Sequence, residues 1–290
     1  TTSLPTIQDQ LKHHTSSVEY IVFHPNQPLL GTGSSDNTAI IYNLDTLPPI
    51  KQHHFKHHID EINSVAFHSS FSLFVTGSDD TTAILYDLTT VPAIIQHHFK
   101  NHKDVVFSVD FHPYLLILAI ATWNNSVILY DISMLPPVLK YNLKHHAKLV
   151  FCVVFHPNIP LLATGSYDES TLLYDISAFS SPSPTLTTSS LVSLTIKYEF
   201  KHHQDSIHSV VFHNTLQLLA TASDDNTIIV YDLTTAPPSI QHHLKNHRVT
   251  IMSVDFHSSL PLLASASGDN TIMLYNLNQI KSQNKKLKTI

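Results

Sequence analysis

The chain has 290 residues, of which 42% are hydrophobic and 13% are charged, and its formal net charge is −6. So few charges, with a slight acidic excess, leave no basic footprint for nucleic acid. The single cysteine excludes an internal disulfide framework and fits a reducing compartment. No apolar run approaches the roughly 18 residues that a membrane-spanning helix needs, and the first residues lack a secretory leader pattern. We therefore expect an intracellular protein, cytoplasmic or nuclear, that binds neither nucleic acid nor membranes.

One stretch of sequence recurs six times along the chain. It begins with an apolar residue, a lysine, a histidine or asparagine and a histidine, and its copies start 44, 44, 44, 57 and 44 residues apart. A fixed period of this length indicates one structural unit that is copied and stacked. We expect a single domain over residues 1–290, with repeats at residues 11–54, 55–98, 99–142, 143–199, 200–243 and 244–290.

The second repeat predicts four short strands in chain order. Residues 62–67 are rich in β-branched and aromatic side chains, and strands at 73–77, 82–88 and 94–100 follow after short polar turns. No window shows a useful helical period, which argues against βαβ units and a parallel sheet. The chain is therefore predicted to be all-β, built from antiparallel meanders. One such sheet cannot bury both faces, so consecutive copies should pack face to face.

The fourth repeat is 13 residues longer than the others, because the step to the next repeat is 57 instead of 44. The extra residues lie within 179–195, a stretch rich in serine, threonine and proline that predicts a flexible loop between the third and fourth strands. Ser181 and Ser183 precede prolines and are candidates for phosphorylation. A passive loop insertion is the simpler interpretation.

The start and end of each repeat resemble the WD-repeat (WD40) β-propeller family across residues 11–277. The family's Gly-His is His-His or Asn-His here, and its Trp-Asp is Tyr-Asp or Tyr-Asn. The resemblance implies a β-propeller of four-stranded antiparallel blades, with six WD40-like repeats visible. A seven-bladed ring with one blade incomplete or missing is the alternative. Either residues 4–8, which are similar to 237–241, or the tail 278–290 would complete the sixth blade.

The resemblance also implies a hydrogen-bonded relay of histidine, hydroxyl residue, aspartate and aromatic ring that stabilises each blade. A relay of this kind is favourable when every buried member has a partner. The matching residues are His14, Thr32, Asp36 and Tyr42; His58, Thr76, Asp80 and Tyr86; His146, Thr164, Asp168 and Tyr174; His203, Thr221, Asp225 and Tyr231; and His247, Ser265, Asp269 and Tyr275. The third repeat departs from the pattern, because Ile120 replaces the hydroxyl and Asn124 replaces the acid, while His102 and Tyr130 remain.

The 23 histidines do not predict a metal site. All but His208 recur in fixed columns of the repeat, so they are spread over the blades, whereas zinc needs three or four ligands around one point. The paired acids at 79–80 and 224–225 are interpreted as a turn residue beside a relay aspartate, and Cys152 as a small residue in a buried strand. The chain has only five glycines and no phosphate-binding loop. We expect no metal, no cofactor and no enzymatic activity.

In the family, three positions per blade point into the face beside the relay turns. By resemblance, the third and fourth repeats carry apolar and aromatic residues there, namely Val105, Phe107, Trp123, Leu149, Phe151 and Tyr167. The first two repeats carry acids there, namely Glu19, Glu61 and Asp79. Exposed aromatic surface marks interfaces, so we predict a protein or peptide site, with basic partner residues near the acids. The alternative is that these rings form ordinary core between blades.

The function expected from these observations is a non-catalytic scaffold for protein–protein interaction, docking partners on the propeller face within a multi-subunit assembly. The alternative is a substrate- or peptide-recognition subunit of an enzyme complex, such as a ubiquitin ligase receptor or a reader of modified peptides. Both interpretations rest on the family resemblance, because a fold alone does not give a function.

Overall fold

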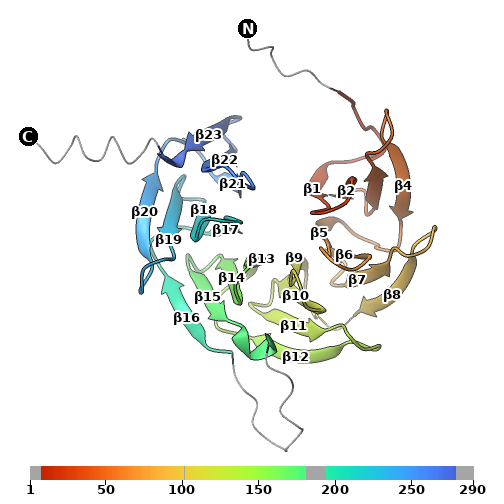
Figure 1. Ribbon diagram of the computed structural model, residues 1–290, viewed down its shortest axis with the longest axis horizontal. Helices are drawn as coiled ribbons and strands as arrows, with labels where there is room; N and C mark the ends of the chain where they lie inside the picture. The colour runs from red at the N-terminus through yellow and green to blue at the C-terminus, as the bar shows by residue number, and fades with distance from the viewer. Residues whose placement is uncertain (1–7, 101, 181–193, 279–290) are drawn as a thin grey trace, which may run out of the picture. The chain divides into compact units, whose positions relative to one another are not determined.

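The computed structural model describes residues 8–100, 102–180 and 194–278. These ranges consist almost entirely of short strands and turns, which Figure 1 labels in chain order. No helix in them is long and apolar enough to cross a membrane. The chain divides into two compact units, residues 1–110 and 111–290, with the boundary inside strand β9.

The first unit contains two complete four-stranded antiparallel sheets and most of β9. Each sheet pairs its strands in chain order, as β1-β2-β3-β4 and β5-β6-β7-β8. The strands are β1 (Val18–Phe23), β2 (Leu29–Ser34), β3 (Ala39–Asn43), β4 (Ile50–Phe55), β5 (Ile62–Phe67), β6 (Leu73–Ser78), β7 (Ala83–Asp87), β8 (Ile94–Phe99) and β9 (Val106–Phe111).

Consecutive sheets of the first unit bury an aromatic core between them. Phe55, Phe67 and Phe74 are all buried there, and the Phe67 and Phe74 rings lie 4.8 Å apart. β2 and β6 are buried along their whole length, and a Cβ atom at Gly33 in β2 would lie 2.8 Å from Ile62 Cγ2 of the next sheet. This explains why the second strand of each repeat carries small residues, which allow close packing of neighbouring sheets.

The second unit continues the same plan, with sheets β13-β14-β15-β16, β17-β18-β19-β20 and β21-β22-β23, and with β10, β11 and β12 paired antiparallel. Its elements are β10 (Ile117–Thr122), β11 (Val127–Asp131), β12 (Val138–Leu143), β13 (Val150–Phe155), β14 (Leu161–Ser166), β15 (Thr171–Asp175), the 3-10 turn η1 (Ser177–Ser180), β16 (Ile196–Phe200), β17 (Ile207–Phe212), β18 (Leu218–Ser223), β19 (Ile228–Asp232), β20 (Ser239–Leu244), β21 (Ile251–Phe256), β22 (Leu262–Ser267) and β23 (Ile272–Asn276).

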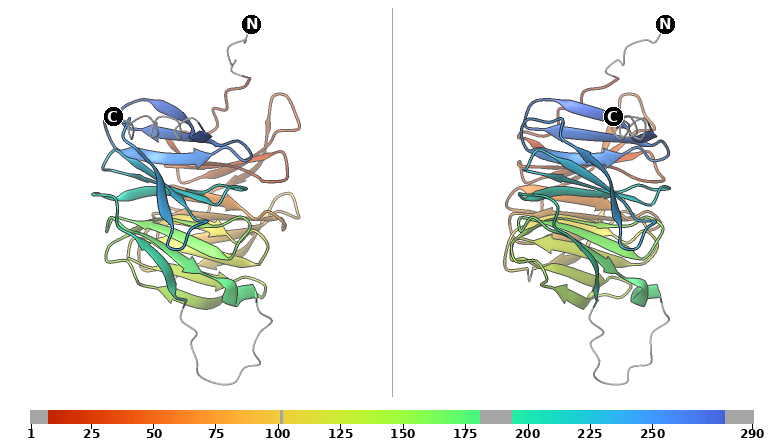
Figure 2. Two further views of the ribbon diagram at one scale, coloured as in Figure 1. Left: turned by 60° about the vertical axis from the view of Figure 1, so that its left-hand side comes forward. Right: turned by 90° about the vertical axis from the view of Figure 1, so that its left-hand side faces the viewer.

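The sheets of the second unit stack face to face, as the layers in Figure 2 show. The approach is close at Gly165, where a Cβ atom would lie 2.8 Å from Cys152 Sγ and 2.8 Å from Ile207 Cγ2. Any side chain at this position would therefore force neighbouring strands apart. Cys152 itself lies in β13, as expected for a small residue packed between sheets.

These observations confirm the predicted fold class, an all-β propeller of four-stranded antiparallel blades with six repeats. In the second repeat the predicted strands agree with β5 to β8 within one residue at the ends. The turn η1 at the start of the insertion was not predicted; its first amide donates to Asp175 Oδ1 at 3.0 Å. Residues 1–7, 181–193 and 279–290 lie outside the described ranges, and with them Ser181, Ser183 and, apart from residues 8 and 278, both segments expected to complete the sixth blade.

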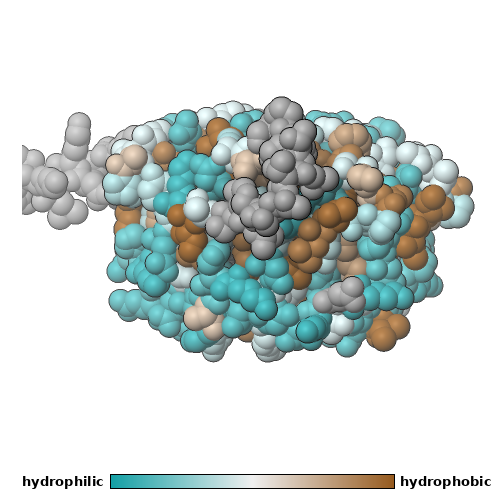
Figure 3. All heavy atoms as spheres, turned by 90° about the horizontal axis from the view of Figure 1, so that it is seen from below, coloured by the Kyte–Doolittle hydropathy of each residue, from teal (hydrophilic) through white to brown (hydrophobic). Residues whose placement is uncertain are grey.

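The first and the last described sheets each present apolar side chains to solvent. β1 of the first unit exposes Ile21 and Phe23, whereas Ile272 and Leu274 are exposed on β23, the edge of a sheet with three described strands. Elsewhere, the side seen in Figure 3 carries separate apolar groups among polar ones. How the propeller closes stays a prediction.

The outer strand of five repeats contains a β-bulge at the same place. The register between the third and fourth strands shifts by one residue beside the aromatic of the relay, for example between Leu129 and Tyr130. A bulge re-aims one side chain. The residue left over by each shift, called the bulge residue below, is Gln52, Gln96, Lys140, Lys197 or Gln241.

Candidate functional site

In five repeats the structure brings together the residues of the expected relay. The fourth repeat is representative: His146 Nδ1 donates to Asp168 Oδ2 at 3.0 Å, and its Nε2 lies 2.7 Å from Thr164 Oγ1. A carboxylate can only accept, so a neutral imidazole leaves Nε2 to accept the threonine hydroxyl proton. The same two contacts recur at His14, His58, His203 and His247, at distances between 2.6 and 3.0 Å.

The relay aspartates are held in the charged form. Burial alone would raise the pKa of Asp36, but hydrogen bonds from the Thr38 side chain, the Thr15 amide and His14 outweigh it and lower that pKa to about 2. The pKa values of Asp80, Asp168 and Asp225 are likewise well below their usual value, against the opposing effect of burial. Burial raises the pKa of Tyr86, which also hydrogen-bonds the Thr76 side chain.

Two further members of the network were missed by the sequence reasoning. The first is the histidine before the relay histidine: His145 Nδ1 lies 3.3 Å from Tyr174 Oη, and the two rings are 5.7 Å apart. His13, His57 and His202 contact their tyrosines in the same way. The second is the hydroxyl two residues after the aspartate, such as Ser170, which donates to Asp168 Oδ1 at 2.5 Å. The constant spacing of 29 residues between this histidine and the tyrosine was the available signal.

In this chain His-His therefore replaces the family's Gly-His, and Tyr-Asp replaces its Trp-Asp, for a physical reason. A tyrosine fills less space than a tryptophan and leaves a hydroxyl that needs a partner. A histidine in place of the glycine fills the remaining space with its ring and offers a ring nitrogen to the tyrosine hydroxyl. In the sixth repeat, where Asn246 replaces this histidine, Tyr275 Oη instead lies 3.3 Å from Met273 Sδ.

The third repeat replaces the relay by a smaller network of hydroxyl groups. In the second unit, Thr122 Oγ1 donates to Asn124 Oδ1 at 2.8 Å, and Ser126 Oγ also hydrogen-bonds Asn124. Ile120 is fully buried. In the first unit His102 is buried, and burial lowers its pKa to about 4, so the imidazole is neutral at pH 7.

The acidic residues of the predicted face lie in the first unit. Ser35 Oγ is 2.7 Å from Glu19 Oε1 and 3.0 Å from Glu61 Oε2, so one hydroxyl bridges two carboxylates of neighbouring repeats. Asn63 Nδ2 donates to Asp79 Oδ1 at 2.6 Å. A serine hydroxyl has one proton, so Ser35 cannot donate to both carboxylates at the same time.

The aromatic residues of the predicted face are divided between the units. Val105 and Phe107 belong to the first unit and are half-buried. In the second unit Trp123 is 48% exposed and Tyr167 is 45% exposed, whereas Leu149 and Phe151 are half-buried. Trp123 and Tyr167 thus reach solvent instead of filling the core between sheets.

Phe151 connects Tyr167 to a histidine that the prediction left out of the site. Its ring centroid lies 6.4 Å from that of Tyr167 and 4.4 Å from that of His208. His208 Nε2 in turn donates to Asp224 Oδ2 at 2.9 Å. Lys148 Nζ lies 4.8 Å above the Tyr167 ring. His208 is the one histidine outside the repeated columns, and this irregularity was the signal that could have found it.

The other side chains that could bind a metal or react chemically lie in surroundings that indicate a structural role. Among the described residues no group of three or more His, Cys, Asp or Glu side chains could hold a metal ion. Burial raises the pKa of the Cys152 thiol to about 12, which keeps it protonated and unreactive. The histidine at the end of each inner strand accepts backbone amides of the following turn, as His156 Nδ1 does from Asn158 at 3.0 Å.

No curated protein matches the chain in sequence. The profile of one family, described as "WD domain, G-beta repeat", matches six times, at residues 5–43, 50–87, 94–131, 137–175, 194–232 and 238–276. Each of these matches ends at the aspartate or asparagine that follows the relay tyrosine. Together they cover most of the chain, and the chain belongs to the WD40 family.

Proposed function

We propose that this chain is a non-catalytic scaffold that docks partner polypeptides on the relay-turn face of its second unit, as part of a larger assembly. WD40 domains are in general protein-interaction modules. The observation that carries the proposal is the exposure of Trp123 and Tyr167, two large aromatic side chains that remain about half in solvent. Aromatic residues of this kind supply a large share of the free energy of binding at interfaces.

The surroundings of Tyr167 suit an interaction hot spot. The ring is bordered by Lys148 and, through Phe151, by the His208–Asp224 pair, so an apolar centre is rimmed by polar groups. Interfaces commonly have an apolar centre and a polar rim of this kind. A partner would bury the two aromatic rings and hydrogen-bond to the rim.

The experiment compares Tyr167→Ala with Tyr114→Ala. Tyr114 is also an exposed tyrosine of the second unit, but it follows β9 at the other ends of the strands, where its hydroxyl donates to Asn158 at 3.2 Å. Proteins that co-purify with the full chain would be quantified by mass spectrometry for the wild type and both variants. We expect Tyr167→Ala to lose partners that Tyr114→Ala keeps, with both melting temperatures unchanged. Equal recovery by both variants would contradict the proposal, as would unfolding of Tyr167→Ala.

The acids of the first unit favour a second candidate, a recognition subunit that selects basic peptides. Glu19 and Glu61 share the Ser35 hydroxyl, so a lysine or arginine of a peptide could neutralise both. The paired change Glu19→Gln and Glu61→Gln should then weaken partner binding and its salt dependence. If recovery of partners stays the same at every salt concentration, the acids take no part in binding.

A further inference from the structure

Two positions of the relay-turn face differ in chemistry between the fourth and the fifth repeats. The second residue after the relay histidine is Lys148 in the fourth repeat and Asp205 in the fifth. The residue before the relay aspartate is Tyr167 in the fourth repeat and Asp224 in the fifth. The second repeat also carries two acids at these positions. The fourth repeat thus carries a cation and an aromatic ring where two other repeats carry a pair of acids.

The backbone on either side of Lys148 is held by hydrogen bonds. Asn125 Nδ2 donates to the carbonyl oxygen just before Lys148 at 2.9 Å. The Tyr167 amide donates to the carbonyl oxygen of Leu149 at 3.0 Å. Asn125 lies in the turn between β10 and β11, which also carries Trp123. The loop of Lys148 is therefore bonded to the turns of both exposed aromatic residues, Trp123 and Tyr167.

The ammonium group of Lys148 contacts a ring but has no counterion. Its Nζ lies 4.8 Å from the centroid of the Tyr167 ring, and the side chain is exposed. Lys140 and Lys197 pair with aspartates at 3.2 and 3.4 Å. In the described part of the second unit no carboxylate, including that of Glu169 in the same turn as Tyr167, forms an ion pair with Lys148. A cation in this position can form an ion pair with an incoming carboxylate.

The position of Lys148 decides which charge a partner can bring to Tyr167. One face of the ring already contacts the chain's own ammonium group, so a lysine or methylated lysine of a partner would meet a like charge there. A carboxylate would instead gain a charge-assisted hydrogen bond from Lys148. Phosphate groups are typically bound by clusters of arginines, and the only arginine of the chain, Arg248, lies in the sixth repeat. The anion that fits is therefore a carboxylate side chain.

Aromatic surface lies next to this cation. Tyr167 is 45% exposed, and the centroid of the half-buried Phe151 ring lies 6.4 Å from that of Tyr167. On the other side of Phe151, the Asp224 carboxylate accepts a hydrogen bond from His208 Nε2 at 2.9 Å, so the chain's own histidine satisfies part of this acid. The surface thus combines a cation with two rings that a large apolar side chain could cover.

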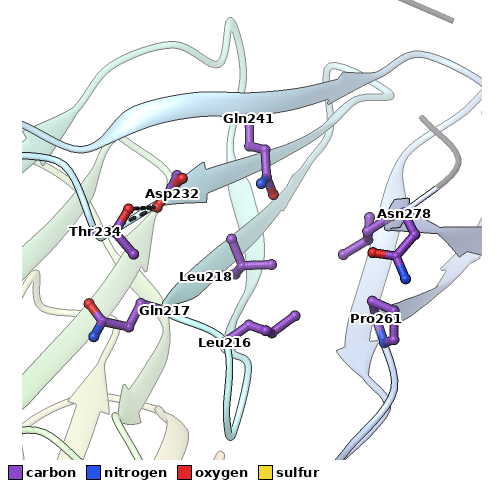
Figure 4. Close-up of a pocket in the computed structure, with 9 residues that line it drawn as sticks. Leu216, Gln217, Leu218, Asp232, Thr234, Gln241, Pro261 and Asn278 are labelled. Carbon is purple, nitrogen blue, oxygen red and sulfur yellow. Dashed lines mark hydrogen bonds between the residues drawn. The ribbon is translucent and has the colours of Figure 1, made fainter. Parts of the chain in front are cut away.

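A pocket elsewhere in the second unit does not suit an acidic segment. It has a volume of about 230 Å³, and Figure 4 shows its lining residues, among them Leu216, Asp232 and Gln241. Its charged group is the Asp232 carboxylate, and no lysine, arginine or histidine lines it, so it would repel an acid. The pocket borders the start of β18, whereas the relay turn of this repeat follows the end of β18. The two surfaces are therefore separate and differ in charge.

We propose that the docking surface around Tyr167 binds a partner segment in which an aspartate or glutamate stands beside a large apolar residue. The carboxylate pairs with Lys148 Nζ, while the apolar side chain covers the rings of Tyr167 and Phe151. This inference rests on the proposed function, because it names the chemistry of the partner at the same surface. It also distinguishes this surface from the acidic residues of the first unit, which suit a basic partner.

The first experiment selects random short peptides displayed on phage against the full chain and removes the clones that also bind the Tyr167→Ala variant. We expect the remaining peptides to share an acid next to a large apolar residue. A synthetic copy should lose about tenfold in affinity when glutamine replaces its glutamate, or asparagine its aspartate. Tyr167-dependent peptides without a preference for an acid would overturn the inference and leave the proposed function standing. A selection without any Tyr167-dependent peptide would also overturn it, and co-purification with Tyr167→Ala judges the proposed function separately.

The second experiment reverses the charge on each side of the contact. Lys148→Glu should weaken the acidic peptide about tenfold, whereas a copy of the peptide with lysine in place of the acid should bind this variant more tightly than the wild type. Lys245→Glu is the matched control, because Lys245 is an exposed lysine that likewise forms no ion pair among the described residues. It changes the net charge equally and should leave the affinity within about twofold. Equal losses in both variants, or no gain from the exchanged charges, would overturn the inference.

Discussion

The turns at Asp168 and at Asn124 occupy the same place in consecutive repeats but satisfy their polar groups differently. At Asp168 a carboxylate accepts from His146, Ser170 and the Ala147 amide. At Asn124 an amide oxygen accepts from two hydroxyls, and an isoleucine stands where Thr164 would be. The acid and the hydroxyl of the relay are therefore replaced together, because removing one alone would leave a buried group without its partner.

Removal of the relay acid should destabilise the fold more than any other single change considered below. Asp168→Ala removes the acceptor of His146 and of Ser170, which are both buried. We expect the free energy of unfolding to fall by about 2–3 kcal/mol, measured by urea denaturation. Asn124→Ala is the matched change in the third repeat and should cost about 1 kcal/mol, because Thr122 and Ser126 lose a neutral acceptor and not a charged one. Equal losses would mean that the relay has no special stabilising role.

A second prediction converts the fourth repeat toward the third. Thr164→Ile and Asp168→Asn each leave His146 with one unsuitable neighbour, so each alone should destabilise the fold. Together they should cost about 1–2 kcal/mol less than the sum of the single changes, because the two sites belong to one network. A double-mutant cycle in urea measures this coupling. Strict additivity would contradict the idea that the two residues are replaced as a pair.

The relay also predicts how the stability of the fold depends on pH. The pKa of Asp36 is about 2 in the folded chain against an ordinary value of 3.8. A depressed aspartate pKa contributes stability that is fully present above the unfolded value and is lost as the pH falls through the folded value. The melting temperature should therefore fall steeply from about pH 4 toward pH 2. The profile of the Asp168→Asn variant should be shallower, since one of the contributing acids is absent.

Much of the fold and part of the site could be predicted from sequence, and the limit has a physical reason. The strands and the relay partners follow from a repeat whose spacing is constant, so one family resemblance places His146, Thr164 and Asp168 in register. The bulge residues, such as Gln241, could not be predicted, because each depends on a one-residue register shift in the outer strand. The role of His208 was missed because the repeat pattern gives contacts within a repeat, whereas the His208 ring contacts Phe151 of the preceding repeat.

The replacement of the family's glycine and tryptophan by histidine and tyrosine can be tested by reversing both changes in the fourth repeat. His145→Gly restores the family's glycine but leaves the Tyr174 hydroxyl without its nitrogen partner, and it should cost about 1 kcal/mol. The double variant with Tyr174→Trp should recover most of this loss, because the larger indole fills the space that the histidine ring vacates. Urea denaturation of both variants decides the matter. If the double variant is less stable than His145→Gly, the residues at positions 145 and 174 do not compensate for each other.

The smallest effect concerns the residue that follows each relay aspartate, which adopts a positive φ. Asn226 has φ 67° in the fifth repeat, whereas the second repeat has Thr81 at φ 70°. Asparagine tolerates this left-handed region, but a β-branched residue does not, at a cost of roughly 1 kcal/mol. Thr81→Asn should therefore raise the free energy of unfolding by about 0.5–1 kcal/mol, while the reverse change Asn226→Thr lowers it by a similar amount. A gain from Thr81→Asn without the matching loss at Asn226 would show that local contacts, and not the backbone angle, set the preference at this turn.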